Sequence, residues 1–137
     1  MEPALALQNA INAILENASD VTARVDPMNI RAGGTRPDDT PCIIIGDGNT
    51  ARHGHDYTAQ RTASVVMDLH IWTLGSGQNA AKEITGKVAA ALDVRKLDIE
   101  GGFCDDFRVV ATRFPRDPNP DYGHGVLSIE AVVRWII

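Results

Sequence analysis

The sequence has little of what marks a secreted or membrane protein. It holds two cysteines in 137 residues, Cys42 and Cys104, and they lack CxxC spacing, so neither a disulfide framework nor a cysteine metal site is indicated. No stretch approaches the roughly 20 apolar residues that cross a bilayer. No Lys or Arg precedes Arg24, so the first residues lack the charged start of a secretory signal. These absences predict reduced thiols, no membrane partner, and synthesis in the cytoplasm.

Positive charge is also scarce. Thirteen Lys and Arg residues stand against eighteen Asp and Glu residues, which gives a net charge of -5. Nucleic-acid backbones and anionic membranes attract basic patches, so this balance disfavours adhesion to either. Aromatic residues make up only 5% of the chain and apolar residues 44%, which predicts a core of Val, Ile, Leu and Ala. At this length we expect one domain over residues 1–137.

Two segments, residues 3–18 and 77–92, have apolar residues at helical spacing. Their apolar sides comprise Leu7, Ile11, Ile14 and Leu15 in the first segment, and Ile84, Val88 and Leu92 in the second. Gly86 interrupts the second helix at a cost of about 1 kcal/mol relative to Ala, and we expect it to allow close packing on a sheet.

Six segments are predicted as strands from β-branched runs or apolar alternation. They are residues 28–32, 41–45, 61–74, 96–100 (KLDIE), 107–114 (FRVVATRF) and 126–136 (VLSIEAVVRWI). Because strands follow one another instead of alternating with helices, the pattern predicts an α+β domain. Its sheet would be mostly antiparallel, with two α-helices packed on one face.

The strand at 61–74 is longer than one domain of this size needs, at about 43 Å for roughly 3.3 Å per residue. The interval before it, residues 46–60, is polar. It begins with a Gly-Asp-Gly turn that ends the strand at 41–45. We therefore predict that this interval and part of the strand project as a β-hairpin or loop arm.

The polar interval contains RHGHDY, residues 52–57, which has two interpretations. His53, His55 and Asp56 could share a metal ion if His70 or His124 supplied a further ligand, which would suggest a small cytosolic metal-dependent enzyme. Alternatively, these hydrogen-bonding and amphipathic side chains suit an interface between subunits. The residues predicted for that interface are Arg52, His53, His55, Asp56, Tyr57 and Arg61.

Signatures of catalysis are missing from the sequence. Ser64, Ser76 and Ser128 lack the GxSxG context of an exposed nucleophile, and the glycines at 46 and 48 lack the GxxxxGK[ST] pattern of a phosphate loop. Asp105 and Asp106, near Glu100, are read as a solvated acidic turn. We therefore expect no enzyme activity, no cofactor and no metal.

Four segments in order, PCIIIGDGNT, VVMDLHIWTL, AAKEITGKVAAALD and RFPRDPNPDYGHGVLSIEAVVRW, resemble the tail-completion or tail-terminator proteins of long-tailed bacteriophages and gene transfer agents. The resemblance covers nearly the whole chain. It implies a structural protein of the virion neck that forms a ring, usually a homo-hexamer, capping the head-proximal end of the tail. The implied partners are the tail tube protein and a head connector or stopper protein. DNA would pass through the channel without specific binding, and the residues of RHGHDY would face a neighbouring subunit or the lumen.

Overall fold

The computed structural model describes residues 1–33, 39–54, 59–75 and 77–137, and it has the predicted α+β fold. Two main helices, α1 (Pro3–Glu16) and α3 (Asn79–Ala91), accompany a short helix α2 (Ser19–Thr22) and a 3-10 turn η1 (Pro27–Asn29). The strands are β1 (Ile30–Ala32), β2 (Cys42–Ile45), β3 (Asn49–Arg52), β4 (Gln60–Leu74), β5 (Phe103–Arg113) and β6 (Tyr122–Ile136).

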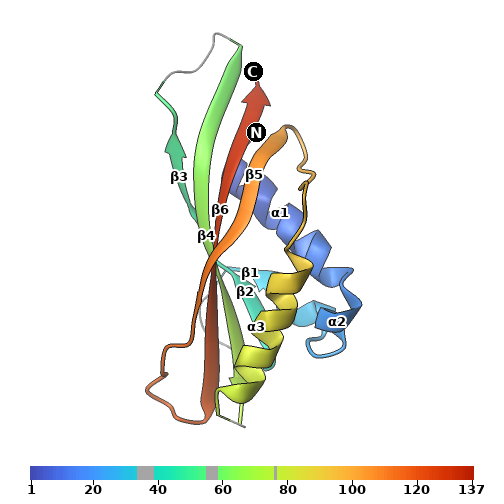
Figure 1. Ribbon diagram of the computed structural model, residues 1–137, viewed down its shortest axis with the longest axis vertical. Coiled ribbons are helices and arrows are strands. Elements are labelled where there is room, and N and C mark those ends of the chain that lie inside the picture. The colour runs from blue at the N-terminus through green and yellow to red at the C-terminus, as the bar shows by residue number, and fades with distance from the viewer. Residues whose placement is uncertain (34–38, 55–58, 76) are drawn as a thin grey trace.

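The sheet is built around β4 and β6, which pair antiparallel from Gln60 opposite Ile136 to Leu74 opposite Tyr122. The strand order is β1-β2-β4-β6-β5, and β3 pairs with β4 off this path. Among the described pairs, β1 and β2 run parallel and the others antiparallel, which confirms the predicted sheet. Figure 1 shows β4 and β6 crossing the whole molecule along its long axis.

Strands β2 and β3 lie one after the other along the same edge of β4. β2 pairs with Leu69–Trp72 and β3 pairs with Ala63–Val66. Between them the Gly46 N–H donates to the Asp68 carbonyl oxygen at 2.8 Å. A Cβ on Gly46 would lie 2.7 Å from that oxygen, so only glycine lets the chain run this close to β4. The Gly-Asp-Gly segment therefore links two strands of one edge.

Both main helices cover one face of the sheet (Figure 1). The side chains of β4 that face them alternate along the strand, as period two requires. The buried set shared by helices and sheet includes Leu7, Ile11, Leu15, Ile84, Val88, Leu92, Val65, Met67, Leu69, Ile71, Leu127 and Ile129. Burying one such side chain is worth about 1.5 to 3 kcal/mol, so this layer supplies most of the stability of the fold. The prediction that the helices pack on one face is confirmed, although Ile14 is only partly buried.

The segment KLDIE, residues 96–100, was predicted as a strand, and this is wrong. Leu97 is buried and Ile99 packs against the core, which explains the period-two pattern. However, the segment is the connection between α3 and β5 and runs beside Ala10 and Ile14 of α1. Its apolar side chains pack on a helix, and in the described structure its backbone is not part of the sheet.

The interval predicted as a β-hairpin or loop arm contains β3, which pairs antiparallel with β4, so the hairpin alternative is confirmed, and β5 begins at Phe103, earlier than predicted. All four residues of β3 are exposed and none is a large apolar residue. Burial therefore left no alternating signal in the sequence. Its backbone pairing with β4 decides the conformation instead.

Close packing of α3 on the sheet depends on glycines of β6, so the expectation for Gly86 is wrong. A Cβ added at Gly86 would meet nothing within 4 Å. At Gly123, in contrast, a Cβ would lie 2.3 Å from Thr73 Oγ1 and 2.6 Å from the Gly77 carbonyl oxygen. At Gly125 it would lie 2.3 Å from Oγ1 of Thr85, which belongs to α3.

A smaller cluster lies on the other face of the sheet, where Cys42 and Ile44 of β2 pack with Trp72. His124 stacks on Trp72 with ring centroids 3.7 Å apart, and its Nε2 lies 3.0 Å from Nδ1 of His70. One of these nitrogens must donate and the other accept, so the pair requires at least one neutral ring. Burial lowers the pKa of both, and for His124 the neighbouring His70 lowers it further, to about 4, against the opposing effect of Asp117.

The two glycine environments predict opposite effects of the same substitution. Gly86→Ala should raise the free energy of unfolding by about 0.5 to 1 kcal/mol, because it removes backbone freedom from the unfolded chain and meets open space. Gly123→Ala should lower it by about 1 to 3 kcal/mol, because Thr73 and the backbone at Gly77 must move away from the added methyl group. Urea unfolding of both variants measures this, and equal effects of the two would contradict the packing described.

The histidine pair predicts a pH dependence. Because its folded pKa values are lowered, the pair's contribution to stability is complete above about pH 6.5 and is lost as the pH falls toward about 4. The loss should be on the order of 1 kcal/mol, once solvent screening of these half-exposed rings is allowed for. Acidic side chains also titrate in this range, so the comparison is with His124→Gln, which keeps a hydrogen-bonding side chain. Urea midpoints at pH 7 and pH 4.5 should differ less in the variant than in the wild type, and parallel losses would disprove this role.

Candidate subunit interface

Of the residues predicted for an interface, the three that the structure describes, Arg52, His53 and Arg61, lie around one end of the long strands. We call this region the β3 end and define it as β3 together with Gln60–Val66 of β4, Glu130–Ile136 of β6 and the following Ile137, and Phe103 of β5, which pairs with Arg134. In Figure 1 it is the upper end, where β4 and β6 reach beyond α1 and where the chain terminates. The Ile137 N–H donates to the Ala59 carbonyl oxygen at 3.0 Å, which ties the C-terminus to this end.

Arg52 and Arg61 lie on the helix side of the β3 end. Arg52 closes β3, and its guanidinium carbon lies 5.3 Å from the ring centroid of Trp135, within the range of a cation–π contact. Arg61 is paired across the sheet with Trp135, and its Nη1 donates to the Gln60 carbonyl oxygen at 3.0 Å. The structure thus brings these two predicted residues together around one buried indole.

His53 lies on the opposite side of the same end. Its N–H donates to the Thr62 carbonyl oxygen at 2.9 Å, which extends the β3–β4 pairing by one residue. Its Nε2 is 2.9 Å from Oγ of Ser64. His55, Asp56 and Tyr57 lie outside the described residues, so the structure tests neither their proposed place nor their side chains.

The geometry gives little support to a shared metal ion. His70 lies eight residues further along β4 than Thr62, which binds the His53 backbone. At about 3.4 Å per residue this separates them by roughly 27 Å, far beyond the span of one ion. His70 instead contacts His124, its fellow candidate ligand. Within the described ranges, no three His, Cys, Asp or Glu side chains are grouped to hold a metal.

Ion pairs cross the face of the sheet that the helices leave uncovered. Arg134 binds Asp105 with both Nε and Nη2, at 2.9 and 3.1 Å, and this hydrogen bonding raises the pKa of Arg134. Two arginines of the neighbouring strand β5 form further ion pairs on the same face. Arg108 binds Glu130 at 3.1 Å, and Arg113 binds Asp68 at 3.5 Å. The sequence analysis missed these pairs.

The missed pairs involve Asp105 and Asp106, which were read as part of a solvated turn, and this is wrong because both lie within β5. Asp106 faces Arg108 at 3.9 Å. The signal was the alternation of Ser128, Glu130 and Arg134 with apolar residues in β6, which marks a strand with one polar face. The acidic partners could then have been sought on the next strand.

Exposed apolar side chains also gather at the β3 end. Phe103 is 50% exposed, and Ile136 and Ile137 are 66% and 68% exposed. The Arg134 guanidinium lies 4.5 Å from the Phe103 ring centroid. Arginine, aromatic and aliphatic groups together on one exposed end are typical of a protein–protein contact.

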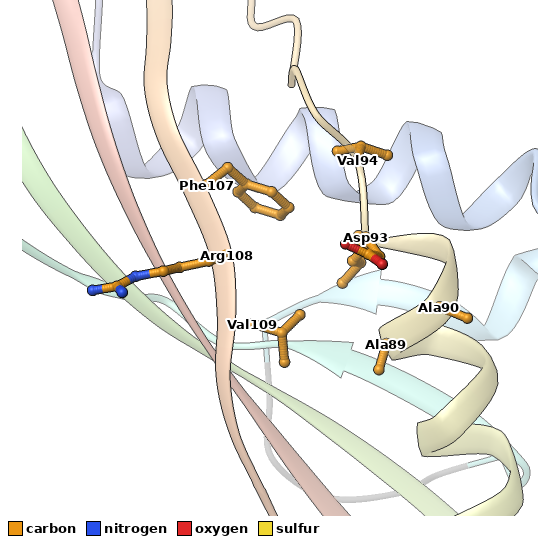
Figure 2. A pocket seen from close by; sticks show the side chains of 8 residues that line it. Ala89, Ala90, Asp93, Val94, Phe107, Arg108 and Val109 are labelled. Carbon is orange, nitrogen blue, oxygen red and sulfur yellow. The ribbon is translucent and has the colours of Figure 1, made fainter.

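A groove of about 430 Å³ lies between the C-terminal part of α3 and β5. Figure 2 shows Phe107 and Val109 directed toward α3, with Ala89 and Ala90 opposite, while Arg108 points away. Of its lining residues, Asp93 carries the single carboxylate, and none is a histidine, serine or cysteine. This arrangement offers no nucleophile with a base. Burial raises the pKa of the Cys104 thiol to about 11, which disfavours the thiolate that a cysteine nucleophile requires.

None of the helices in the described part of the chain is long and apolar enough to cross a membrane.

Comparison with known proteins agrees with a structural role. No curated protein matches the sequence. Among solved structures, a chain of the native gene transfer agent virion is similar at 21% identity, with a TM-score of 0.82 and 96% of each chain covered. The gp17 protein of bacteriophage SPP1 is similar at 21% identity, with a TM-score of 0.59, over 94% of this chain and 89% of that one. At these identities the likeness establishes the fold.

The family comparison goes further, because a family model described as tail completion protein gp17 matches residues 9–134. This range runs from within α1 to Arg134 near the end of β6 and includes the ion-paired face. It confirms the resemblance seen in the sequence and sets aside the metal-dependent enzyme. The chain therefore belongs to the tail completion protein gp17 family, and it is a structural component of a phage-like virion tail and not an enzyme.

Proposed function

We propose that this chain forms a ring, a homo-hexamer, that caps the head-proximal end of a tail tube and provides the surface to which the head docks. The observation that carries the proposal is the β3 end, where a tail completion protein exposes arginine, aromatic and aliphatic side chains that one copy leaves uncovered. A ring repeats each such contact around its axis, so modest contacts suffice for assembly.

The partners in this proposal are the tail tube protein on one side of the ring and a head connector or stopper protein on the other. Likeness over 96% of a chain in the gene transfer agent virion supports a place within an assembled particle. The interface residues are Arg52, His53 and Arg61, together with His55, Asp56 and Tyr57 of the same sequence motif. Arg52 and Arg61 can serve as anchors, because arginine is enriched where interfaces are strong.

The proposal is tested by charge reversal at the β3 end. Arg52→Glu should leave a folded subunit, since Arg52 is exposed, but should reduce ring formation and the yield of joined particles at least tenfold. The matched control is Arg95→Glu, the same charge change at an exposed arginine after α3. Light scattering measures the ring, and electron microscopy of complemented particles measures tail completion. If Arg52→Glu particles are complete and joined to heads at the Arg95→Glu level, the β3 end is not the interface.

DNA would pass through this ring without binding it. Each copy adds a net charge of -5, so the assembly repels a polyanion, whereas non-specific affinity requires basic side chains placed against phosphates.

Fluorescence anisotropy of a labelled duplex should therefore stay flat at physiological salt up to about 10 µM protein, well inside the range where basic proteins bind non-specifically. Saturable micromolar binding that weakens with added salt would show that the channel holds DNA.

A further inference from the structure

The sheet has two open edges at the same level. Row by row at the β3 end, Arg52 lies beside Ala63 of β4, which lies beside Val133 of β6, which lies beside Cys104 of β5. The next row runs from Ala51 through Ser64 and Val132 to Asp106. In the described residues the sheet therefore ends at β3 on one side and at β5 on the other. Most residues of both strands are exposed, and such edges pair readily with another chain.

The directions of the four strands fit a cyclic assembly. Along the order β3-β4-β6-β5, every neighbouring pair is antiparallel, so β3 and β5 run in opposite directions. Rotation about an axis roughly parallel to the strands keeps the direction of each strand. A rotated copy would thus set its β3 antiparallel to the β5 of its neighbour, and the alternation would continue unbroken around a ring.

We propose that copies of this chain join by antiparallel pairing of β3 in one copy with the Cys104–Arg108 part of β5 in the next. The inference rests on the proposed ring and names the contact that builds it. The four strands of each copy would then form one closed wall, and neither edge would remain exposed.

Charge disfavours the simplest rival, a two-fold contact between two β5 strands. Asp105 and Asp106 lie on β5 at this level, and self-pairing would bring the carboxylates of both copies close together. The β3 strand, Asn49–Arg52, contains one basic residue and no acidic one. The β3–β5 contact therefore avoids a repulsion that the β5–β5 contact creates. A β5–β5 contact also stops at a dimer, whereas β3–β5 is head-to-tail and can close a ring.

Site-directed cross-linking tests the pairing in the complete chain. Ala51 and Asp106 occupy the same row and the same uncovered face, so the variant Ala51→Cys with Asp106→Cys places one thiol on each edge. Cys104 is changed to Ala to remove the neighbouring thiol, and Cys42 is buried. A bismaleimide linker spanning about 10 Å bridges paired strands without requiring one register, since adjacent strands lie roughly 5 Å apart.

The matched control combines Ala51→Cys with Arg113→Cys, which lies on the same strand and face as position 106 but seven residues further along, or roughly 24 Å. Pairing of β3 with β5 predicts a denaturant-resistant ladder of linked copies up to the ring number for the 51/106 variant. The 51/113 variant and both single-cysteine variants should give no ladder. A second pair, Asn49→Cys with Asp106→Cys, should behave like the first and covers the case in which the first variant fails to fold.

The outcomes separate this inference from the ring itself. Cross-linking is carried out on the isolated protein and on particles that contain the variant, with the copy number measured in each. A ring without a 51/106 or 49/106 ladder, or with a ladder only from the 51/113 pair, overturns the strand pairing and leaves the ring intact. Dimers from the Asp106→Cys single variant favour the β5–β5 contact and also overturn it. Particles that hold a single copy would overturn the proposed ring and also the strand pairing, which depends on the ring.

Discussion

The structure depends on the pairing of β4 with β6 over the whole length of both strands. Each has 15 residues, or about 50 Å at roughly 3.4 Å per residue. This register fixes which side chains face the helices, and it creates the two flanks on which the other strands add. β2 and β3 share one flank, and β5 occupies the other. Helix α1, with 14 residues, is only about 21 Å long, so neither helix spans the ribbon. The exposed end of the ribbon is a direct result of this mismatch in length.

The sequence predicted the elements that bury one side, because burial of one side requires apolar residues at a regular spacing. The spacing of Leu7, Ile11 and Leu15 indicates one face of a helix, and the alternation around Leu69 indicates one face of a strand. Each pattern arises because only one side of the element contacts the core. The α+β class followed from the order of these elements. The family resemblance came from the same segments and added what periodicity cannot show, namely that the chain belongs to a virion tail.

The errors arose in segments where side chains are buried although the backbone does not pair in the sheet, or where the backbone pairs although the side chains are exposed. In KLDIE the burial is real, but Leu97 packs on a helix, so a strand pattern exists without a strand. In β3 the pairing is real, but Asn49, Thr50 and Ala51 are exposed, so a strand exists without a pattern. Gly86 was judged by its place in a helix, whereas the close contact belongs to Gly123, whose neighbours Thr73 and Gly77 come from elsewhere in the chain. Contacts between residues that lie far apart in the chain cannot be predicted from the spacing of residues in a single sequence.

The one-sided helix layer also bears on how a ring of these chains would curve. A sheet with bulky helices on one face occupies more circumference on that face, so the helices would lie outside and the ion-paired face inside. That inner face carries the acidic residues Asp68, Asp105, Asp106 and Glu130 against the basic residues Arg108, Arg113 and Arg134. Each arginine is paired with a carboxylate of its own chain, which leaves its charge locally compensated. Most of the net charge of -5 would then lie away from the channel. In such a wall these arginines are engaged by carboxylates, so they would not offset the repulsion of a polyanion by the net negative charge of the assembly.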